Sequence, residues 1–208
     1  MKLIQHIESG DAQILITDIP DNSEVLKGQL KNFEAYRSQY ETLGHEKRKR
    51  EFLSARIALN QLLNSQVVVE YDMDRKPFIK DNPVRISISH STRYLAVITH
   101  PEAIVGIDIE EISSRVSKVY RRFLSAEEQS YLLSDDIRAL QIAWSAKECL
   151  YKMIGKASSD FAATLRLHPF DASPSEGSLQ ADCIINNESY TLHYQREASY
   201  LLVYGIKI

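Results

Sequence analysis

Two short segments of the chain combine carboxylates and lysines in spacings that suit phosphate chemistry. They are Val105–Glu111, in which apolar and acidic residues alternate, and Trp144–Lys152. On a strand, Asp108 and Glu110 share one face with Cα atoms roughly 7 Å apart, so their side chains can converge on one cation. Glu148 can add a third carboxylate with lysines around it. Three oxygen ligands beside a basic helix suit a magnesium-bound pyrophosphate.

Both segments also have an ordinary structural interpretation. Asp108 and Glu110 can form the solvent face of a half-exposed strand, although Asp and Glu are poor strand formers. Glu148 and Lys152 can be an i,i+4 pair on a solvated helix face. Lys147 falls among apolar neighbours on another stripe of that helix, which a simple core face would avoid. Its charge is therefore a candidate addition to a phosphate site.

Polar residues in the first half of the chain offer a second possible anion site. His90 lies in the segment Ile86–Ser91, whose serines and following turn suit an anion pocket. A strand-end histidine bonded to its neighbours is the alternative, and without a second histidine at ligand spacing zinc is not expected. Arg56 lies next to an apolar helical stripe, which favours a pairing or ligand role. Lys47–Arg50 fits a solvated helix face.

Composition narrows the functional classes. The chain has 208 residues, 44% hydrophobic and 25% charged, and a net charge of −3, which argues against bulk nucleic-acid binding. There is no P-loop, dinucleotide glycine fingerprint or nucleophile elbow. With two cysteines a disulfide framework is not expected. Neither a membrane-length apolar run nor a signal segment is recognised, so we expect a cytoplasmic protein without a membrane partner.

Secondary-structure signals alternate along the chain. The predicted strands are Ile14–Ile19, Val67–Tyr71, Ile86–Ser91, Tyr94–Thr99, Ala103–Glu110, Ala163–Leu167, Ala181–Ile185, Tyr190–Tyr194 and Tyr200–Ile206. The predicted helices are Glu34–Leu63, Ala126–Leu133 and Ile137–Ile154. Ser125 and Glu128 have capping-box spacing, and Gly155 can end the last helix.

These elements predict an α+β fold built from two similar lobes. Residues 1–101 would form the first lobe, and residues 102–208 the second, which carries the candidate metal carboxylates. Each lobe would pack a small, mainly antiparallel sheet on one long helix. A pseudo-twofold would relate the lobes, with the ligand cleft between them. Because one chain would then supply the whole cleft, we expect a monomer.

In combination, the motifs resemble the 4′-phosphopantetheinyl transferase superfamily, specifically its surfactin-synthetase-activating type. The segments that carry the resemblance are Ile88–Ser91, Gly106–Glu110, Trp144–Glu148, Lys152 and Gly155-Lys156. Arg75-Lys76-Pro77 resembles the family's Gly-Lys-Pro loop, with arginine in place of glycine. Order and spacing agree across about residues 45–157.

The resemblance implies an enzyme that transfers 4′-phosphopantetheine from coenzyme A to a serine of an apo acyl or peptidyl carrier protein, releasing 3′,5′-ADP. It implies Mg²⁺, or Mn²⁺ as an alternative, on Asp108, Glu110 and Glu148, with Glu148 and Lys152 as the catalytic residues. Glu148 would deprotonate the serine directly or through water. One carboxylate cannot easily be both a tight metal ligand and a free base, and the sequence leaves that choice open.

The resemblance also implies binding positions for coenzyme A and the carrier. Lys152 and Lys156 would contact the pyrophosphate. The coenzyme A residues expected from the first half of the chain are Arg56, Ser89 and His90 at the 3′-phosphate, with the Lys47–Arg50 cluster as a further candidate there, and Lys76 and Pro77 at the adenine. Carrier domains are typically acidic around the modified serine, so the basic rim Arg115–Phe123, with Lys118, Arg121 and Arg122, would be the dock.

Two other functions remain open on the sequence. A non-catalytic binder of coenzyme A or a carrier protein would be expected to lack a metal carboxylate or Lys152, and all are present. A magnesium-dependent phosphohydrolase would use water and need no acceptor protein. The sequence does not identify which carrier would be the acceptor, nor whether acylated coenzyme A is accepted.

Overall fold

The structure is a computed structural model that describes residues 1–155 and 160–208. The chain divides into two compact units, Met1–Glu102 (unit 1) and Ala103–Ile208 (unit 2). Both combine helices with antiparallel sheet, which confirms the α+β class. In the described residues, no helix has the length and apolar character needed to cross a membrane.

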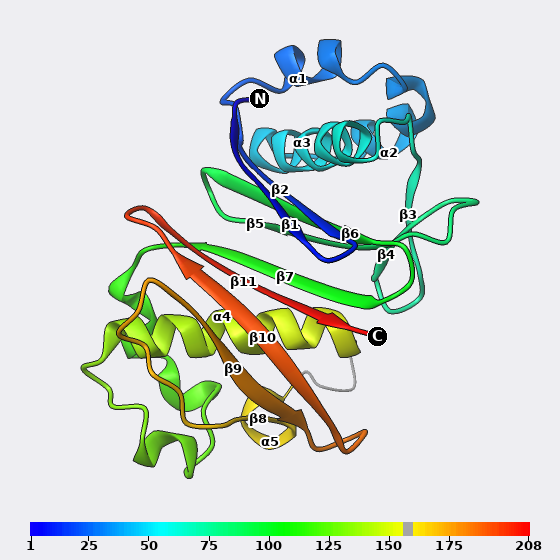
Figure 1. Cartoon of the computed structure of the whole chain (residues 1–208). Helices are drawn as coiled ribbons and strands as arrows, with labels where there is room; N and C mark the ends of the chain where they lie inside the picture. Colours follow the sequence, from blue (N-terminus) through cyan, green and yellow to red (C-terminus); the bar gives the residue numbers. More distant parts are fainter. Residues whose placement is uncertain (156–159) are drawn as a thin grey trace. The chain divides into compact units, whose positions relative to one another are not determined.

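Unit 1 is a four-stranded antiparallel sheet packed on one long helix (Figure 1). The strands, in the order β1-β2-β6-β5, are β1 (Leu3–Ser9), β2 (Ala12–Asp18), β6 (Tyr94–His100) and β5 (Arg85–His90). A separate hairpin is formed by β3 (Val69–Tyr71) and β4 (Pro77–Ile79). The helices are α1 (Ser23–Gln29), α2 (Arg37–Glu41) and α3 (Glu46–Leu62), of which α3 contacts the sheet.

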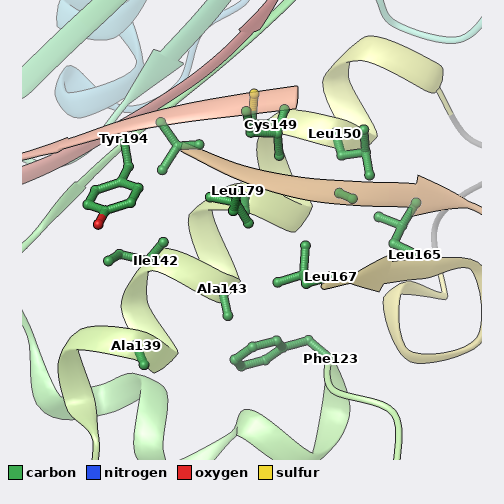
Figure 2. Packing of buried hydrophobic residues seen from close by; sticks show 14 of the residues in the cluster. Phe123, Ala139, Ile142, Ala143, Cys149, Leu150, Leu165, Leu167, Leu179 and Tyr194 are labelled. Atoms are coloured by element: carbon green, nitrogen blue, oxygen red, sulfur yellow. The ribbon is translucent and has the colours of Figure 1, made fainter. Parts of the chain in front are cut away.

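Unit 2 is a five-stranded antiparallel sheet with its own long helix. The strands, in the order β7-β11-β10-β9-β8, are β7 (Ile104–Glu111), β11 (Tyr200–Lys207), β10 (Glu188–Arg196), β9 (Glu176–Cys183) and β8 (Leu165–Leu167). The helices are α4 (Ile137–Ile154) and α5 (Phe161–Thr164). Figure 2 shows the core, where Ile142 and Ala143 of α4 lie under Leu179 of β9.

The two units share a connectivity. In unit 1 the strand before the long helix, β2, pairs with the last strand, β6. In unit 2 the strand before the long helix, β7, likewise pairs with the last strand, β11. In both units the last strand also pairs with the strand that precedes it, β5 or β10. In each unit, therefore, a strand is followed by the long helix, and the last two strands form an antiparallel pair that returns beside the first. The predicted pseudo-twofold between the lobes stays a prediction.

The predicted helix Glu34–Leu63 is wrong as a single element. The chain instead forms a 3₁₀ turn at Phe33–Tyr36, then α2, and α3 begins only at Glu46. The Glu46 carboxylate accepts hydrogen bonds from the Ser23 backbone N (2.8 Å) and from Ser23 Oγ (2.9 Å). A contact from 23 residues earlier therefore fixes where α3 begins, and local periodicity does not contain that information.

The predicted helix Ala126–Leu133 is reduced to a 3₁₀ turn at Glu128–Ser130. The capping-box bonds nevertheless form, from the Ser125 backbone N to Glu128 Oε2 (2.7 Å) and from the Glu128 backbone N to Ser125 Oγ (3.2 Å). The other carboxylate oxygen of Glu128 accepts from the Leu167 backbone N (2.9 Å). Glu128 is thus held by β8, and its local motif does not extend into a helix.

Gly106 allows α4 to approach β7 closely. A Cβ atom added at Gly106 would lie 2.4 Å from the Cys149 carbonyl oxygen and 2.5 Å from Met153 Cγ. The face of β7 that carries Gly106 therefore packs on α4. Since residues two apart share a face of a strand, Asp108 and Glu110 are directed toward the same helix.

We expect Gly106→Ala to lower the free energy of unfolding by roughly 1–3 kcal/mol, because α4 must move off the sheet to accommodate the methyl group. Urea unfolding followed by circular dichroism measures the change. Gly28→Ala is the matched control: Gly28 lies in α1 with no atom near the added Cβ. That change should be neutral or stabilising by up to about 1 kcal/mol. Equal stability of the two variants would contradict this packing.

Candidate active site

Asp108 and Lys152 form a partly buried ion pair between β7 and α4. Asp108 is 4% exposed, and its Oδ1 lies 2.8 Å from Lys152 Nζ. The same ammonium donates to the Ile107 carbonyl oxygen at 2.9 Å. The solvent-face interpretation of the strand is therefore wrong for Asp108, because its face meets α4 and not water.

Glu110 lies on the same face of β7 and meets the preceding turns of α4. Trp144 Nε1 donates to Glu110 Oε1 at 3.2 Å. Burial and the neighbouring charge of Asp108 raise the pKa of Glu110, and the bond from Trp144 opposes that rise. The strand thus presents two carboxylates to one helix, and each contacts a different helical residue.

Glu148 completes a group of three carboxylates, Asp108, Glu110 and Glu148, which we call the carboxylate cluster. Burial raises the pKa of Glu148 to about 7, and the charges of Asp108 and Glu110 add to the rise while Lys152 opposes it. Lys152 and Glu148 are thus more than an i,i+4 surface pair. A carboxylate that titrates near neutrality can accept a proton and return it at physiological pH.

The raised pKa of Glu148 predicts a pH-dependent stability. The folded state holds this proton more tightly than the unfolded chain, so the stabilisation is complete below about pH 4.5 and is lost as pH rises through about 7. Glu148→Gln removes the titration. Between pH 5 and 8 the variant should therefore gain on the order of 1–2 kcal/mol relative to wild type, a value discounted for residual exposure. Urea unfolding across this range measures the difference, and parallel stability curves would contradict the prediction.

A groove of about 650 Å³ in unit 2 opens beside Glu148. We call it the Glu148 groove, and its lining residues are Val119, Arg122, Phe123, Trp144, Glu148, Asp160 and Phe161. The Trp144 ring lies edge-on to Phe123, with centroids 5.2 Å apart, and is tilted against Phe161 at 5.9 Å. The volume and the mixture of aromatic wall and charged groups are typical of small-molecule sites. Asp160 and Phe161 were not anticipated, because neither stands in a motif.

Lys147 lies outside the carboxylate cluster. Its side chain is fully buried, and Nζ lies 2.7 Å from Glu128 Oε2. The expectation that Lys147 adds positive charge to a phosphate site is therefore wrong. Its charge is neutralised by a carboxylate 19 residues away in sequence.

Arg56, a predicted coenzyme A residue, is 1% exposed in the core of unit 1. Its guanidinium stacks 3.4 Å from the centroid of the Phe52 ring and donates to the Phe52 carbonyl oxygen at 3.1 Å. Burial lowers the pKa of this arginine. A side chain held in this way presents no charge to a ligand, so we do not carry Arg56 into the proposed site.

The other predicted coenzyme A residues lie at different places on unit 1. His90 is exposed at the end of β5, with Nδ1 3.4 Å from Glu51 Oε1, whereas Ser89 is buried. Lys76 and Pro77 are half-buried at the start of β4, where burial and then the charge of Arg85 lower the pKa of Lys76. The remaining predicted residue, Lys156, lies outside the described residues.

The carboxylate cluster suits a hard cation by the chemistry of its donors. Carboxylate oxygens are the ligands that Mg²⁺ prefers, and the mutual pKa effects indicate that the three charges interact. Across residues 1–155 and 160–208, however, no three His, Cys, Asp or Glu side chains are arranged to hold a metal ion as they stand. Asp108 is instead bonded to Lys152.

Comparison with known proteins relates this site to a family. Residues 104–204 match the model of the 4′-phosphopantetheinyl transferase superfamily. The chain is 31% identical over 147 residues to a 4′-phosphopantetheinyl transferase of Bacillus pumilus, psf-1, covering 62% of the chain and 59% of that protein. It is 32% identical over 99 residues to the 4′-phosphopantetheinyl transferase gsp of Aneurinibacillus migulanus, covering 45% of the chain and 40% of that protein.

The chain thus matches less than two thirds of the length of either relative. The matched family region runs from β7 to β11 and includes the carboxylate cluster, Lys152 and the Glu148 groove. The resemblance recognised in the sequence is confirmed: residues 104–204 match the 4′-phosphopantetheinyl transferase superfamily, and both relatives are 4′-phosphopantetheinyl transferases.

Proposed function

We propose that the protein transfers the 4′-phosphopantetheine group of coenzyme A to a serine hydroxyl of an apo acyl or peptidyl carrier protein, as a transferase of the surfactin-synthetase-activating type. The single observation that carries the proposal is the carboxylate cluster, with Lys152 bonded to Asp108 and the groove opening at Glu148. The family match supports the same reaction class.

The transfer requires one proton acceptor and stabilisation of one leaving group. The serine oxygen bonds to the phosphorus that bears pantetheine, and the bond from that phosphorus to the bridging oxygen breaks. The bridging oxygen leaves with the electron pair as part of 3′,5′-ADP. Glu148 is our candidate to receive the serine proton, directly or through water, because its pKa lies near 7.

The carboxylate cluster would hold Mg²⁺, or Mn²⁺, through Asp108, Glu110 and Glu148. When bound, such a cation neutralises pyrophosphate charge and charge building on the leaving group. The Lys152 ammonium forms an ion pair with Asp108. Both Lys152 and Lys156 would contact the pyrophosphate. If Glu148 holds the cation tightly, this carboxylate is less able to accept the serine proton, so its metal-ligand and proton-acceptor roles are alternatives.

Unit 1 would recognise the nucleotide end of coenzyme A. The resemblance assigns His90 and Ser89 to the phosphate ester; the His90 imidazole is exposed and suited to it through hydrogen bonding, whereas Ser89 is buried. Lys76 and Pro77 would border the adenine. These assignments rest on the sequence resemblance, and the exposure of His90 is compatible with its role.

The carrier would dock on the basic rim Arg115–Phe123, since Lys118, Arg121 and Arg122 are exposed and Arg122 also lines the Glu148 groove. We expect Lys118→Glu/Arg121→Glu to raise the KM for an acidic carrier about tenfold and to leave kcat unchanged, because rim charges act mainly on encounter. Steady-state transfer at low salt measures both constants. Lys2→Glu/Lys80→Glu is the control with the same change in net charge, and equal KM values for the two variants would refute this dock.

Release of 3′,5′-ADP tests the proposed reaction against its alternatives. Purified protein is incubated with coenzyme A and Mg²⁺, with and without an apo carrier protein, and nucleotides are quantified by chromatography. Release that requires the carrier supports the transferase. Release without any carrier would identify a phosphohydrolase, and coenzyme A binding without release would identify a non-catalytic binder.

A further inference from the structure

A buried ammonium joins four segments of unit 2 at one point. Lys147 Nζ lies 2.7 Å from Glu128 Oε2 and 2.8, 2.9 and 3.2 Å from the carbonyl oxygens of Phe123, Leu165 and Phe161, so these four acceptors share its three N–H donors. Lys147 and Glu128 are both fully buried. Glu128 in turn accepts from the Leu167 backbone N at 2.9 Å, which ties β8 to the same point.

Two of those carbonyl oxygens belong to walls of the Glu148 groove. Phe123 and Phe161 both line it, and their rings pack on the Trp144 ring. Lys147 is also the residue before Glu148 on α4. Adjacent residues of α4 therefore have separate roles. Glu148 supplies the carboxylate of the groove. Lys147, on another side of the helix, binds the backbone of two aromatic residues that line the groove.

A contribution to the free energy of unfolding does not by itself explain why Lys147 and Glu128 are buried together. A buried ion pair can often be replaced by apolar residues of similar volume without loss of stability, because desolvation opposes the attraction between the charges. An apolar replacement would, however, lose the hydrogen bonds to three carbonyl oxygens from separate segments. The particular contribution of Lys147 is thus to hold Phe123, Phe161 and Leu165 in one geometry.

We infer that Lys147, with Glu128, is a positioning residue that fixes Phe123 and Phe161 around Trp144 and so sets the shape of the Glu148 groove in which the transfer takes place. The catalytic part of this inference rests on the proposed function. The structural part does not, because it concerns only the aromatic wall.

Trp144 is the single tryptophan of the chain, so its fluorescence reports on this wall alone. The test variant is Lys147→Met/Glu128→Gln, in which both charges are removed and an amide oxygen remains for the Leu167 backbone N. We expect a native circular dichroism spectrum, Trp144 emission at longer wavelength and stronger quenching by acrylamide. The kcat/KM for transfer should fall roughly 10- to 100-fold, as expected when a site is displaced by about 1 Å.

Arg166→Gln is the matched control. Arg166 contacts Ser125 and the carboxylate of Glu127 (3.2 Å), next to Glu128, but does not line the groove. This variant removes a neighbouring cation while the contacts of Lys147 remain. Its Trp144 emission and kcat/KM should match those of wild type.

The outcomes separate this inference from the proposed function. A folded double variant with wild-type emission, quenching and kcat/KM would overturn the positioning role. A shifted Trp144 signal in a protein whose wild type transfers nothing would retain the positioning role and refute the transferase. If the double variant does not fold, Lys147→Arg keeps the charge but changes the donor geometry, and wild-type fluorescence and kcat/KM in that variant would overturn the inference.

Discussion

Replacing Asp108 with asparagine is expected to lower the turnover of coenzyme A and apo carrier by about 10²- to 10⁴-fold, the range that corresponds to several kcal/mol of lost charge stabilisation. The side chain keeps its size but loses its charge. Lys152 then loses its ion-pair partner at 2.8 Å, and the carboxylate cluster loses one of three anionic donors. Steady-state transfer at saturating Mg²⁺, together with calorimetric titration of Mg²⁺, measures both consequences.

Asp135→Asn is the control for this substitution. Asp135 is exposed, and it lies before α4 and outside the cluster. It should retain wild-type transfer and Mg²⁺ affinity. If Asp108→Asn kept full activity and affinity while its circular dichroism remained native, the cluster would not be the site of the reaction.

Replacing Glu148 with glutamine is expected to lower kcat by about 10²- to 10⁴-fold, the usual contribution of a general base. The wild-type rate should rise with pH through about 7, because the carboxylate must be ionised to accept a proton and burial raises the pKa of Glu148 to that value. The variant should lose this limb of the pH profile.

The two roles of Glu148 separate in the same experiment. A proton acceptor predicts that Glu148→Gln leaves the Mg²⁺ concentration for half-maximal rate unchanged. A metal ligand predicts that this concentration rises together with the loss of kcat. An unaltered kcat with an unaltered pH profile would exclude both roles.

Elements with strong local signals were predictable from the sequence. The helix Ile137–Ile154 has its predicted bounds because both ends are fixed by nearby residues. The Asp136 side chain accepts from the Ala139 backbone N at 2.9 Å, and Gly155 ends the helix with a φ of 105°. A helix that contains its own start and stop signals needs no tertiary information.

Elements and contacts fixed by distant residues were not predictable. The start of α3 depends on Ser23 meeting Glu46, and the environment of Lys147 depends on Glu128, 19 residues away. The position of Lys147 on an apolar stripe was recognised as unusual. The pattern of charges along one helix, however, does not identify which residue of another segment binds Lys147. The acidic face of β7 was recognised correctly, whereas its burial against α4 follows from Gly106, whose missing side chain gives no periodic signal.

The most direct test of the proposed transfer is the intact mass of an apo acyl carrier protein after incubation with this protein, coenzyme A and Mg²⁺. We predict a gain of one phosphopantetheine, about 340 Da, which is absent with EDTA and with the Asp108→Ala variant. No gain with any of several acyl and peptidyl carriers, under conditions in which the protein is folded and coenzyme A binds, would contradict the transferase.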